Sequence, residues 1–195
     1  MIETETFIPD VIKLDKKTSK KDMSWTSFFI TLAFIIIFRV FVLEPHNVSG
    51  SSMDDTFKDG DYVIVDKISY RFKNPEKGDV IVFNPPASVE NKSRFIKRVI
   101  ATPTETIEVL DGKTYINKKV VTEDYEKYKS PKTSASTFLD DNQYFVMGDN
   151  RYVSFDSRYW GPIVKDEIQG RVLLRLYPFN KIAFFPGAKE YSGNK

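Results

Sequence analysis

A single long apolar run constrains this 195-residue chain more than any other feature. Residues 23–43 read MSWTSFFITLAFIIIFRVFVL, with no charged side chain before Arg39. A helix of this length, at about 1.5 Å per residue, is about 31 Å long, which matches the hydrocarbon thickness of a bilayer. The run is apolar on all sides, without a polar stripe. We therefore expect a membrane-spanning helix rather than a buried core helix.

The charged residues on either side of this run predict its orientation. The fifteen residues before it contain five lysines, whereas the fifteen after it contain only Lys58. Because positively charged flanks stay in the cytoplasm, we expect a cytoplasmic tail at 1–22, a single-pass helix in the plasma membrane at 23–43 and an extracytoplasmic domain at 44–195. A cleavable signal peptide is the alternative, but the apolar run is long for one and no A-x-A-like cleavage site follows it.

Beyond the anchor, apolar and polar residues alternate, which is typical of β-strands with one buried face. The strand-like runs are rich in β-branched and aromatic residues, and turn signals such as Lys-Asp-Gly-Asp separate them. They occupy residues 62–65, 79–83, 94–101, 105–110, 143–147 and 168–176. We therefore expect an all-β domain of coiled antiparallel sheets, in which residues 111–141 form a hairpin and a loop that leave the main sheet.

The residue types that are missing exclude several kinds of chemistry. The chain has no cysteine and a single histidine, His46. It therefore lacks disulfides, thiol nucleophiles and cysteine-bound metals, and a Ser-His-Asp triad would depend on His46 alone. We expect no cofactor and no metal. The formal net charge of +2 comes from scattered basic residues, so we do not expect nucleic acid as a partner.

A hydrolase of this composition needs a base other than histidine, and lysine can serve when burial keeps it neutral. Its pKa of about 10.4 would have to fall by about three units, at a cost on the order of 4 kcal/mol. Lys97 is the candidate, because strand alternation places it between Phe95 and Val99 on one face. The alternative is that Lys97 guards an exposed sheet edge against aggregation.

Two further segments are rich in hydroxyl and charged groups. The first, Ser-Gly-Ser-Ser-Met-Asp-Asp-Thr at residues 49–56, is either a linker behind the anchor or a turn that presents a nucleophile. The second, residues 148–161, reads GDNRYVSFDSRYWG and follows an apolar strand. In it Asp156 and Arg158 can pair, and Ser154 can hydrogen-bond a buried amine. An ordinary surface turn is the alternative for this segment.

These motifs, in this order, resemble those of the bacterial type I signal peptidases, or leader peptidases. The matching residues extend from Arg39 to Gly170. They are the anchor, Glu44-Pro45, Ser52-Met53 with Thr56, Gly60-Asp61, Lys77-Gly78-Asp79-Val80, Ile96-Lys97-Arg98 and the 148–161 motif. The last motif is the most specific, whereas the Ser-Met and Lys-Arg pairs are specific only together. The resemblance implies a membrane serine protease that uses a serine–lysine dyad to remove signal peptides from exported preproteins.

The same resemblance assigns roles to individual residues. It implies Ser52 as the nucleophile, Lys97 as the general base, Ser154 as the group that hydrogen-bonds and orients the lysine, Asp156 and Arg158 as a supporting ion pair, and Asp149 as a residue that holds the turn. The backbone N–H of Ser52 would bind the oxyanion. Cleavage after small residues, at Ala-x-Ala-like sites, would follow from shallow pockets lined by Val48 and Ile96. The implied partners are preprotein signal peptides and membrane lipid.

Two other hypotheses belong to different classes. The first is a catalytically weak relative that acts as an assembly or binding partner in surface export, and its motivation is Asp55, which replaces the proline usual in Ser-Met-x-Pro-Thr. The second is a self-cleaving repressor-type peptidase, but the apolar run and the lack of a helix-turn-helix pattern argue against it. If Lys97 is a base, activity should rise toward alkaline pH.

Overall fold

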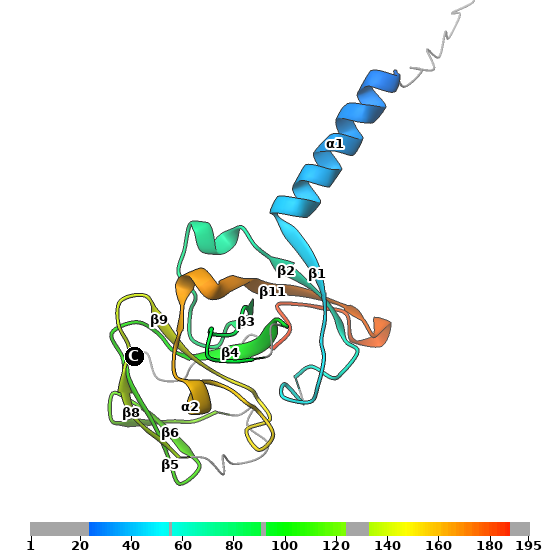
Figure 1. Ribbon diagram of the computed structural model, residues 1–195. Helices are drawn as coiled ribbons and strands as arrows, with labels where there is room; N and C mark the ends of the chain where they lie inside the picture. Colours follow the sequence, from blue (N-terminus) through cyan, green and yellow to red (C-terminus); the bar gives the residue numbers. More distant parts are fainter. Residues whose placement is uncertain (1–23, 55, 91–92, 124–132, 188–195) are drawn as a thin grey trace, which may run out of the picture. The chain divides into compact units, whose positions relative to one another are not determined.

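The computed structural model describes residues 24–54, 56–90, 93–123 and 133–187, with side chains for all of these except 37–41 (Figure 1). The expected cytoplasmic tail at 1–22 and Asp55 lie outside the described residues, as does most of the polar segment that precedes residue 133.

The first element is the helix α1, Trp25–Phe41, which lies inside the predicted span. Its sequence, WTSFFITLAFIIIFRVF, contains no glycine or proline, so nothing interrupts the helical hydrogen bonds. Its large apolar side chains are exposed, among them Trp25, Phe29 and Phe34. Within the described part of the chain, no helix has the combined length and apolar character that a bilayer crossing requires.

The domain that follows is built from twelve described strands. They are β1 (Leu43–Asn47), β2 (Tyr62–Asp66), β3 (Val80–Phe83), β4 (Phe95–Ala101), β5 (Thr106–Leu110), β6 (Lys113–Ile116), β7 (Lys119–Val121), β8 (Ser134–Phe138), β9 (Gln143–Met147), β10 (Ile163–Val164), β11 (Ile168–Tyr177) and β12 (Ala183–Phe184). Four short helices connect them: η1 (Ser69–Arg71), α2 (Ser157–Trp160), η2 (Lys165–Glu167) and η3 (Phe179–Lys181).

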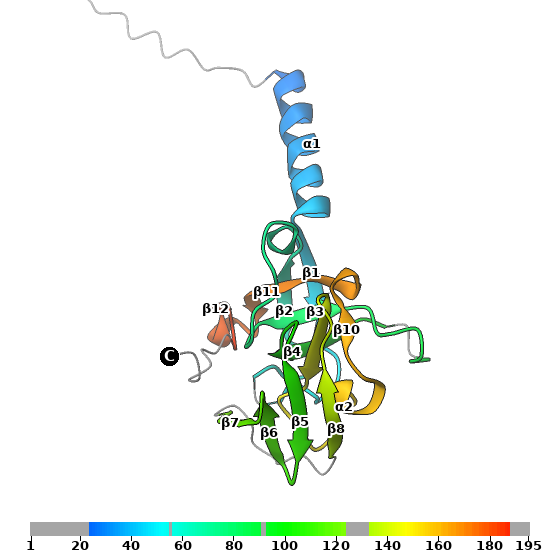
Figure 2. The ribbon, with the colours of Figure 1, turned by 90° about the vertical axis from the view of Figure 1, so that its left-hand side faces the viewer.

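The strands form two sheets, and every pairing between described strands is antiparallel. The larger sheet has the order β1-β2-β11-β3-β4-β9-β10, with β12 added beside β11, and the smaller one has the order β7-β6-β5-β8 (Figure 2). This arrangement confirms the predicted antiparallel all-β architecture of the domain. The smaller sheet contains the predicted hairpin at residues 113–121 as β6 and β7, and β8 completes it.

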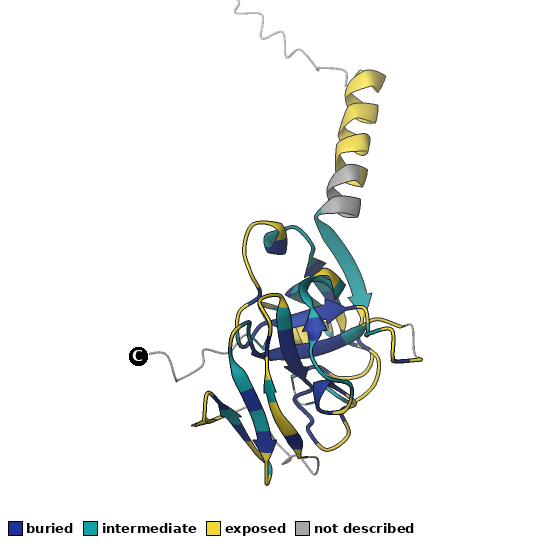
Figure 3. Cartoon of the chain, turned by 60° about the vertical axis from the view of Figure 1, so that its left-hand side comes forward, coloured by how far each residue is buried: buried dark blue, intermediate teal, exposed yellow. Residues whose placement is uncertain are grey.

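The centre of the larger sheet is buried on both faces, as the dark blue strands in Figure 3 show. Alternation in β3 explains why. Val80 and Val82 enter one apolar cluster, together with residues of the β1–β2 region, whereas Ile81 and Phe83 enter a second cluster on the other face. A strand covered on both sides is dry along its whole length, so a polar side chain on it loses its water. The neighbouring strand β4 carries Lys97 under these conditions.

Candidate active site

Ser52 lies in a turn within the long connection, residues 48–61, at the closed end of the β1–β2 hairpin. Two backbone hydrogen bonds close this turn, from Val48 N to Asp61 O at 2.8 Å and from Gly60 N to Val48 O at 2.9 Å. The side chains of Met53 and Phe57 are completely buried in the core beneath it. Because the buried side chains of Met53 and Phe57 fix the turn against the core, the half-buried Ser52 beside Met53 is held at the surface of the core. The described residues around Ser52 are therefore packed against the domain rather than forming a free linker.

Lys97 lies on β4, opposite Ile81 of β3, and its side chain is 4% exposed. Its Nζ atom lies 2.7 Å from Ser52 Oγ, which is a hydrogen-bonding distance. The same atom donates to the carbonyl oxygen of Ile96 at 3.1 Å. The structure thus brings together the two residues predicted as nucleophile and base, which are 45 positions apart in the sequence.

The surroundings of Lys97 match the predicted alternation and exclude the sheet-edge alternative. The Lys97 Nζ atom lies 5.3 Å from the centre of the Phe95 ring, and Val99 is completely buried. Strand β4 is hydrogen-bonded to β3 on one side and to β9 on the other, so it is an interior strand. A charge that guards a sheet against aggregation belongs on an edge strand. Lys97 therefore has no such role.

Burial lowers the pKa of Lys97 to about 8, because a buried ammonium loses its hydration. The carboxylates of Asp156 and Asp149 raise the pKa of Lys97, since negative charge favours the protonated amine. The positive charge of Arg158 lowers it further. Desolvation is the largest of these effects. An amine with a pKa near 8 is partly neutral at physiological pH and can accept a proton, which an ordinary lysine cannot do.

Gly148 brings the loop after β9 into direct contact with the turn that carries Ser52. A Cβ atom at this position would lie 2.3 Å from the carbonyl oxygen of Ser52 and 2.3 Å from Ser154 Oγ, so only glycine fits. Two residues further on, the backbone N–H of Asn150 donates to the same Ser52 carbonyl at 3.1 Å. The loop therefore positions the backbone of Ser52, which in turn directs its hydroxyl toward Lys97.

The predicted ion pair between Asp156 and Arg158 is present, and both side chains are completely buried. Arg158 Nη2 lies 2.7 Å from Asp156 Oδ2, and Arg158 Nε donates to Asp156 Oδ1 at 2.7 Å. Asp156 Oδ2 also accepts from Gly148 N at 3.0 Å. A two-pronged pair of this kind fixes both side chains, so the loop keeps its shape around Ser52.

Ser154 is buried beside Gly148, but its hydroxyl has a different partner from the one implied by the resemblance. Ser154 Oγ accepts from Gly148 N at 3.2 Å. Among the described residues, Lys97 Nζ hydrogen-bonds Ser52 and Ile96, and a direct bond to Ser154 is not formed. Ser154 therefore reaches the dyad here through the Gly148 backbone, and its role in orienting the lysine stays a prediction.

Asp149, predicted to hold the turn, is paired with a residue that sequence reasoning missed. Arg98 Nε donates to Asp149 Oδ1 at 2.8 Å and Arg98 Nη2 lies 2.6 Å from Asp149 Oδ2, with both side chains fully buried. Thr56 Oγ1 donates to the same carboxylate. The signal was available, because alternation places Arg98 on the opposite face of β4 from Lys97, where a buried guanidinium requires an acidic partner.

A second missed pair connects the loop to the smaller sheet. Arg151 donates to both carboxylate oxygens of Glu123, at 2.6 and 2.7 Å, and to the carbonyl oxygen of Gly148 at 3.0 Å. Each charged side chain is 1% exposed. Glu123 comes from a polar stretch without a motif, so no sequence pattern indicated that it pairs with Arg151.

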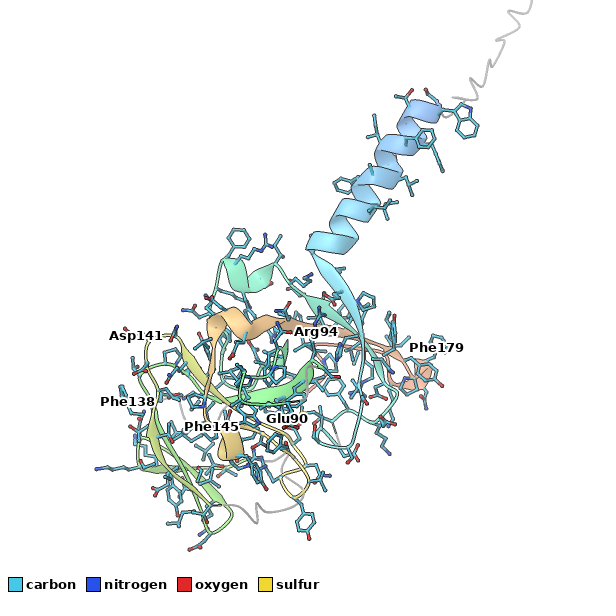
Figure 4. All side chains as sticks on the ribbon, viewed as in Figure 1. Glu90, Arg94, Phe138, Asp141, Phe145 and Phe179 are labelled. Atoms are coloured by element: carbon cyan, nitrogen blue, oxygen red, sulfur yellow. The ribbon has the colours of Figure 1, made fainter. Side chains whose placement is uncertain are left out.

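A cleft of about 400 Å³ opens over Ser52 and Lys97. Its lining includes His46, Arg94, Phe95, Ile96, Val153 and Phe155, together with Lys97 and the turn that carries Ser52. Arg94, labelled in Figure 4, pairs with Glu44 of β1 at this rim. The prediction that Ile96 and Val48 line a substrate pocket agrees with the lining for Ile96 only. Val48 is not among the residues that line the cleft, although it packs in the same buried cluster as Ile96 and Met53.

No group of three or more histidine, cysteine, aspartate or glutamate side chains in the described residues is arranged to hold a metal ion.

Comparison with known proteins identifies relatives of the whole chain. The family model described as "Signal peptidase, peptidase S26" matches residues 22–177. The protein named "Probable signal peptidase I-2" from Synechocystis sp. is 34% identical over 194 residues, which cover 96% of this chain and 88% of that protein. "Signal peptidase IB" from Staphylococcus aureus is 34% identical over 188 residues, which cover 85% of this chain and 95% of that protein. A solved signal peptidase I from Enterococcus faecalis aligns with 51% of this chain and 97% of its own, at 31% identity and a TM-score of 0.43.

Proposed function

Because this chain belongs to the peptidase S26 family of signal peptidases and is itself a signal peptidase, we propose that it is a membrane-anchored serine endopeptidase in which Ser52 is the nucleophile and Lys97 the general base. The observation that carries this proposal is the 2.7 Å distance between Lys97 Nζ and Ser52 Oγ, with the amine buried among apolar neighbours.

The proposed reaction has two steps. Neutral Lys97 takes the proton from Ser52 Oγ as that oxygen attacks the scissile carbonyl carbon, and the resulting ammonium then gives a proton to the leaving amine. The mature protein departs and the signal peptide remains as an ester of Ser52. Lys97 next deprotonates a water molecule that attacks the ester carbonyl, and the resulting ammonium returns its proton to Ser52 Oγ as the signal peptide leaves with a free carboxylate. The backbone N–H of Ser52 stabilises the oxyanion in both steps.

The residues around the dyad support this chemistry by holding its geometry. Gly148 and Asn150 contact the Ser52 carbonyl, and the Asp156–Arg158 pair fixes the loop that carries Gly148. The loop therefore restricts the position of Ser52 before substrate arrives. A misplacement of about 1 Å at a reacting group can reduce a rate by about 100-fold, so such bracing is part of the catalytic machinery.

The location and the substrate class are proposals of the same kind. We infer that residues 23–43 anchor the enzyme in the plasma membrane with its N-terminus in the cytoplasm and its β-domain outside. A preprotein carries its signal sequence in the same membrane, so anchoring raises the effective concentration of substrate at the site. An extended peptide in the cleft beside Ile96 would present alternate side chains to it, and shallow subsites there favour small residues before the cut.

The catalytically weak alternative has no specific observation in its favour. Asp55, which motivated it, lies outside the described residues.

The proposal is tested by cleavage of a preprotein with an Ala-x-Ala site by the full chain, purified in detergent. We expect the parent to cut it and Ser52→Ala and Lys97→Ala to leave it intact, each with a native circular dichroism spectrum. The matched controls are Ser136→Ala and Lys119→Ala, which change exposed residues of the smaller sheet and should cut normally. Undiminished cleavage by either dyad variant would exclude the proposed mechanism.

Anchoring and orientation have their own measurement. We expect the chain to stay in the membrane fraction after alkaline carbonate extraction, and protease added to intact spheroplasts to digest the β-domain. Release into the supernatant would exclude the anchor, and protection from the added protease would reverse the orientation.

A further inference from the structure

A second pocket of about 430 Å³ lies on the β-domain and shares no residue with the cleft over the dyad. It is formed where the segment after β2, which contains η1, meets the segment of η2 and the start of β11. In Figure 1 these are the teal helical turn and the orange one. The residues that line the pocket are Lys67, Tyr70, Arg71, Lys165, Asp166, Ile168 and Gln169.

The composition of this second pocket favours an anion with an apolar neighbour. The lining residues include the cations Lys67, Arg71 and Lys165 and the carboxylate of Asp166. Lys67 is paired with Glu44 at 3.2 Å, so three cations stand against two carboxylates and the excess positive charge comes from Arg71 and Lys165. The hydroxyl of the buried Tyr70 donates to Asp79 at 2.7 Å. Because the polar end of this side chain is occupied by that bond, Tyr70 contributes the apolar surface of its ring to the pocket. Lys165 Nζ donates to Asn74 Oδ1 at 2.7 Å, which ties the η2 side of the pocket to the η1 side. Phosphate is the common biological anion that clustered lysine and arginine side chains bind.

An exposed aromatic side chain lies directly beside these cations. Phe72 follows Arg71 in the sequence and is 85% exposed, and the next residue, Lys73, is exposed too. A phenylalanine flanked by basic residues suits a surface that contacts the boundary between lipid headgroups and acyl chains, where apolar and cationic side chains both find partners.

Chain connectivity places this pocket close to the end of the proposed anchor. The backbone N–H of Lys67 donates to the carbonyl oxygen of Val42 at 2.9 Å, and Leu43 of β1 pairs with Asp66 of β2. Val42 is among the last residues of the proposed span. If the chain leaves the bilayer there, as the proposed function requires, the β2–η1 segment is held at the level of the headgroups.

We propose that this pocket binds the headgroup phosphate of an anionic phospholipid, with Phe72 in the headgroup–acyl boundary beside it. The inference rests on the proposed anchoring but not on the serine–lysine chemistry. The bound lipid would fix one edge of the β-domain to the membrane surface. The β1–β2 hairpin carries Ser52 at its other end, so this contact would also set the height of the dyad above the bilayer.

A group of exposed aromatic side chains around η3 and β12 lies at the opposite end of β2 from the contact with Val42. Tyr177, Phe179 and Phe184 are exposed around η3 and β12, and Tyr177 pairs with Tyr62 at the opposite end of β2 from Asp66. Four residue steps along β2, about 13 Å, separate Tyr62 from Asp66. Phe179, labelled in Figure 4, lies well away from η1.

The test measures lipid binding directly, on the full chain in neutral detergent micelles, by native mass spectrometry. The probes are phosphatidylglycerol, phosphatidylcholine and inorganic phosphate. We expect the parent to bind phosphatidylglycerol more tightly than phosphatidylcholine. A cation near a lipid surface contributes about fivefold in affinity, so Arg71→Ala/Lys165→Ala should weaken phosphatidylglycerol binding about 25-fold. The matched control Lys113→Ala/Lys119→Ala removes the same charge from exposed positions on the smaller sheet and should bind as the parent does.

Phe72→Ser separates a lipid from a free anion, since it should weaken binding of phosphatidylglycerol and leave binding of inorganic phosphate unchanged. Parent-like phosphatidylglycerol binding by Arg71→Ala/Lys165→Ala would overturn the proposal. So would binding of inorganic phosphate as tight as that of the lipid, which would indicate a site for a free anion. Because cleavage is not the readout, inactivity of the dyad would not affect this result, and failure of anchoring would appear separately in the carbonate extraction.

Discussion

The pH dependence of cleavage is the sharpest consequence of the buried amine. Only the neutral form of Lys97 can take the proton of Ser52, so kcat/KM should follow the neutral fraction. With the pKa lowered to about 8 by burial, that fraction is about 9% at pH 7 and about 91% at pH 9. We therefore expect kcat/KM to rise about tenfold between these two pH values and then to level off.

The assay is cleavage of an internally quenched peptide with an Ala-x-Ala site, at substrate concentrations well below KM, by the full chain in detergent. Each sample is also returned to pH 8 after incubation, so that loss of enzyme at the extremes is separated from titration. Asp156→Asn provides an internal check. Its carboxylate favours the ammonium form of Lys97, so its removal should move the rise to lower pH, whereas Lys119→Ala should leave the profile unchanged.

Two results would refute this reasoning. A flat profile between about pH 6.5 and 9.5 would show that no group with the pKa expected of Lys97 limits the reaction. A rise that continues to about pH 10.5 without levelling would show a lysine with an ordinary pKa, and hence an amine that is exposed to water.

Three further predictions concern the frame of the site. Gly148→Ala places a Cβ atom 2.3 Å from the Ser52 carbonyl oxygen, so we expect kcat to fall about 100-fold, and parent-like activity would contradict the bracing role of the loop. The pKa of Lys97 is about 8 in the folded chain and 10.5 in the unfolded chain, so between these two pH values the folded chain binds fewer protons. The free energy of unfolding therefore rises with pH across this range. Below pH 8, burying the protonated amine lowers the free energy of unfolding by about 3 kcal/mol. Lys97→Met should therefore raise the midpoint of thermal unfolding at pH 7 by about 5 to 10 °C, with a gain that shrinks toward pH 10, and an unchanged midpoint at both pH values would contradict the lowered pKa. Glu123→Ala leaves the Arg151 charge buried without its carboxylate partner, so the free energy of unfolding should fall by about 3 to 5 kcal/mol in near-ultraviolet circular dichroism melts, and a parent-like melt would show that the pair is not structural.

Local patterns predicted several strands closely because side-chain alternation is a property of neighbouring residues. The expected strand at 62–65 is β2, and the one at 143–147 is β9. The same alternation identified Lys97 as a lysine between apolar neighbours. Pattern could not distinguish a central strand from an edge strand, since that depends on which strands pair, and the position of β4 between β3 and β9 comes from pairing alone.

The contacts that hold the site illustrate the same limit. The Asp156–Arg158 pair was predictable because its members are two residues apart and meet at the start of α2. The Arg98–Asp149 pair joins residues 51 positions apart, so alternation could indicate that Arg98 needs an acidic partner but not which residue supplies it. Ser154 was expected to contact Lys97, but in the folded loop the backbone N–H of Gly148 is its hydrogen-bond donor.

By itself, the order of residues determined which side chains share a strand face, where the turns occur, and that a hydrolase of this composition has neither a thiol nor an obvious histidine base. Those properties depend on a few adjacent residues. Only the tertiary structure decided that the amine of Lys97 meets the hydroxyl of Ser52, because their approach depends on how β1, β2, β11 and β3 order themselves between the two residues. The lowered pKa of Lys97 follows from the same packing, since side chains that are distant in the sequence exclude water from the amine.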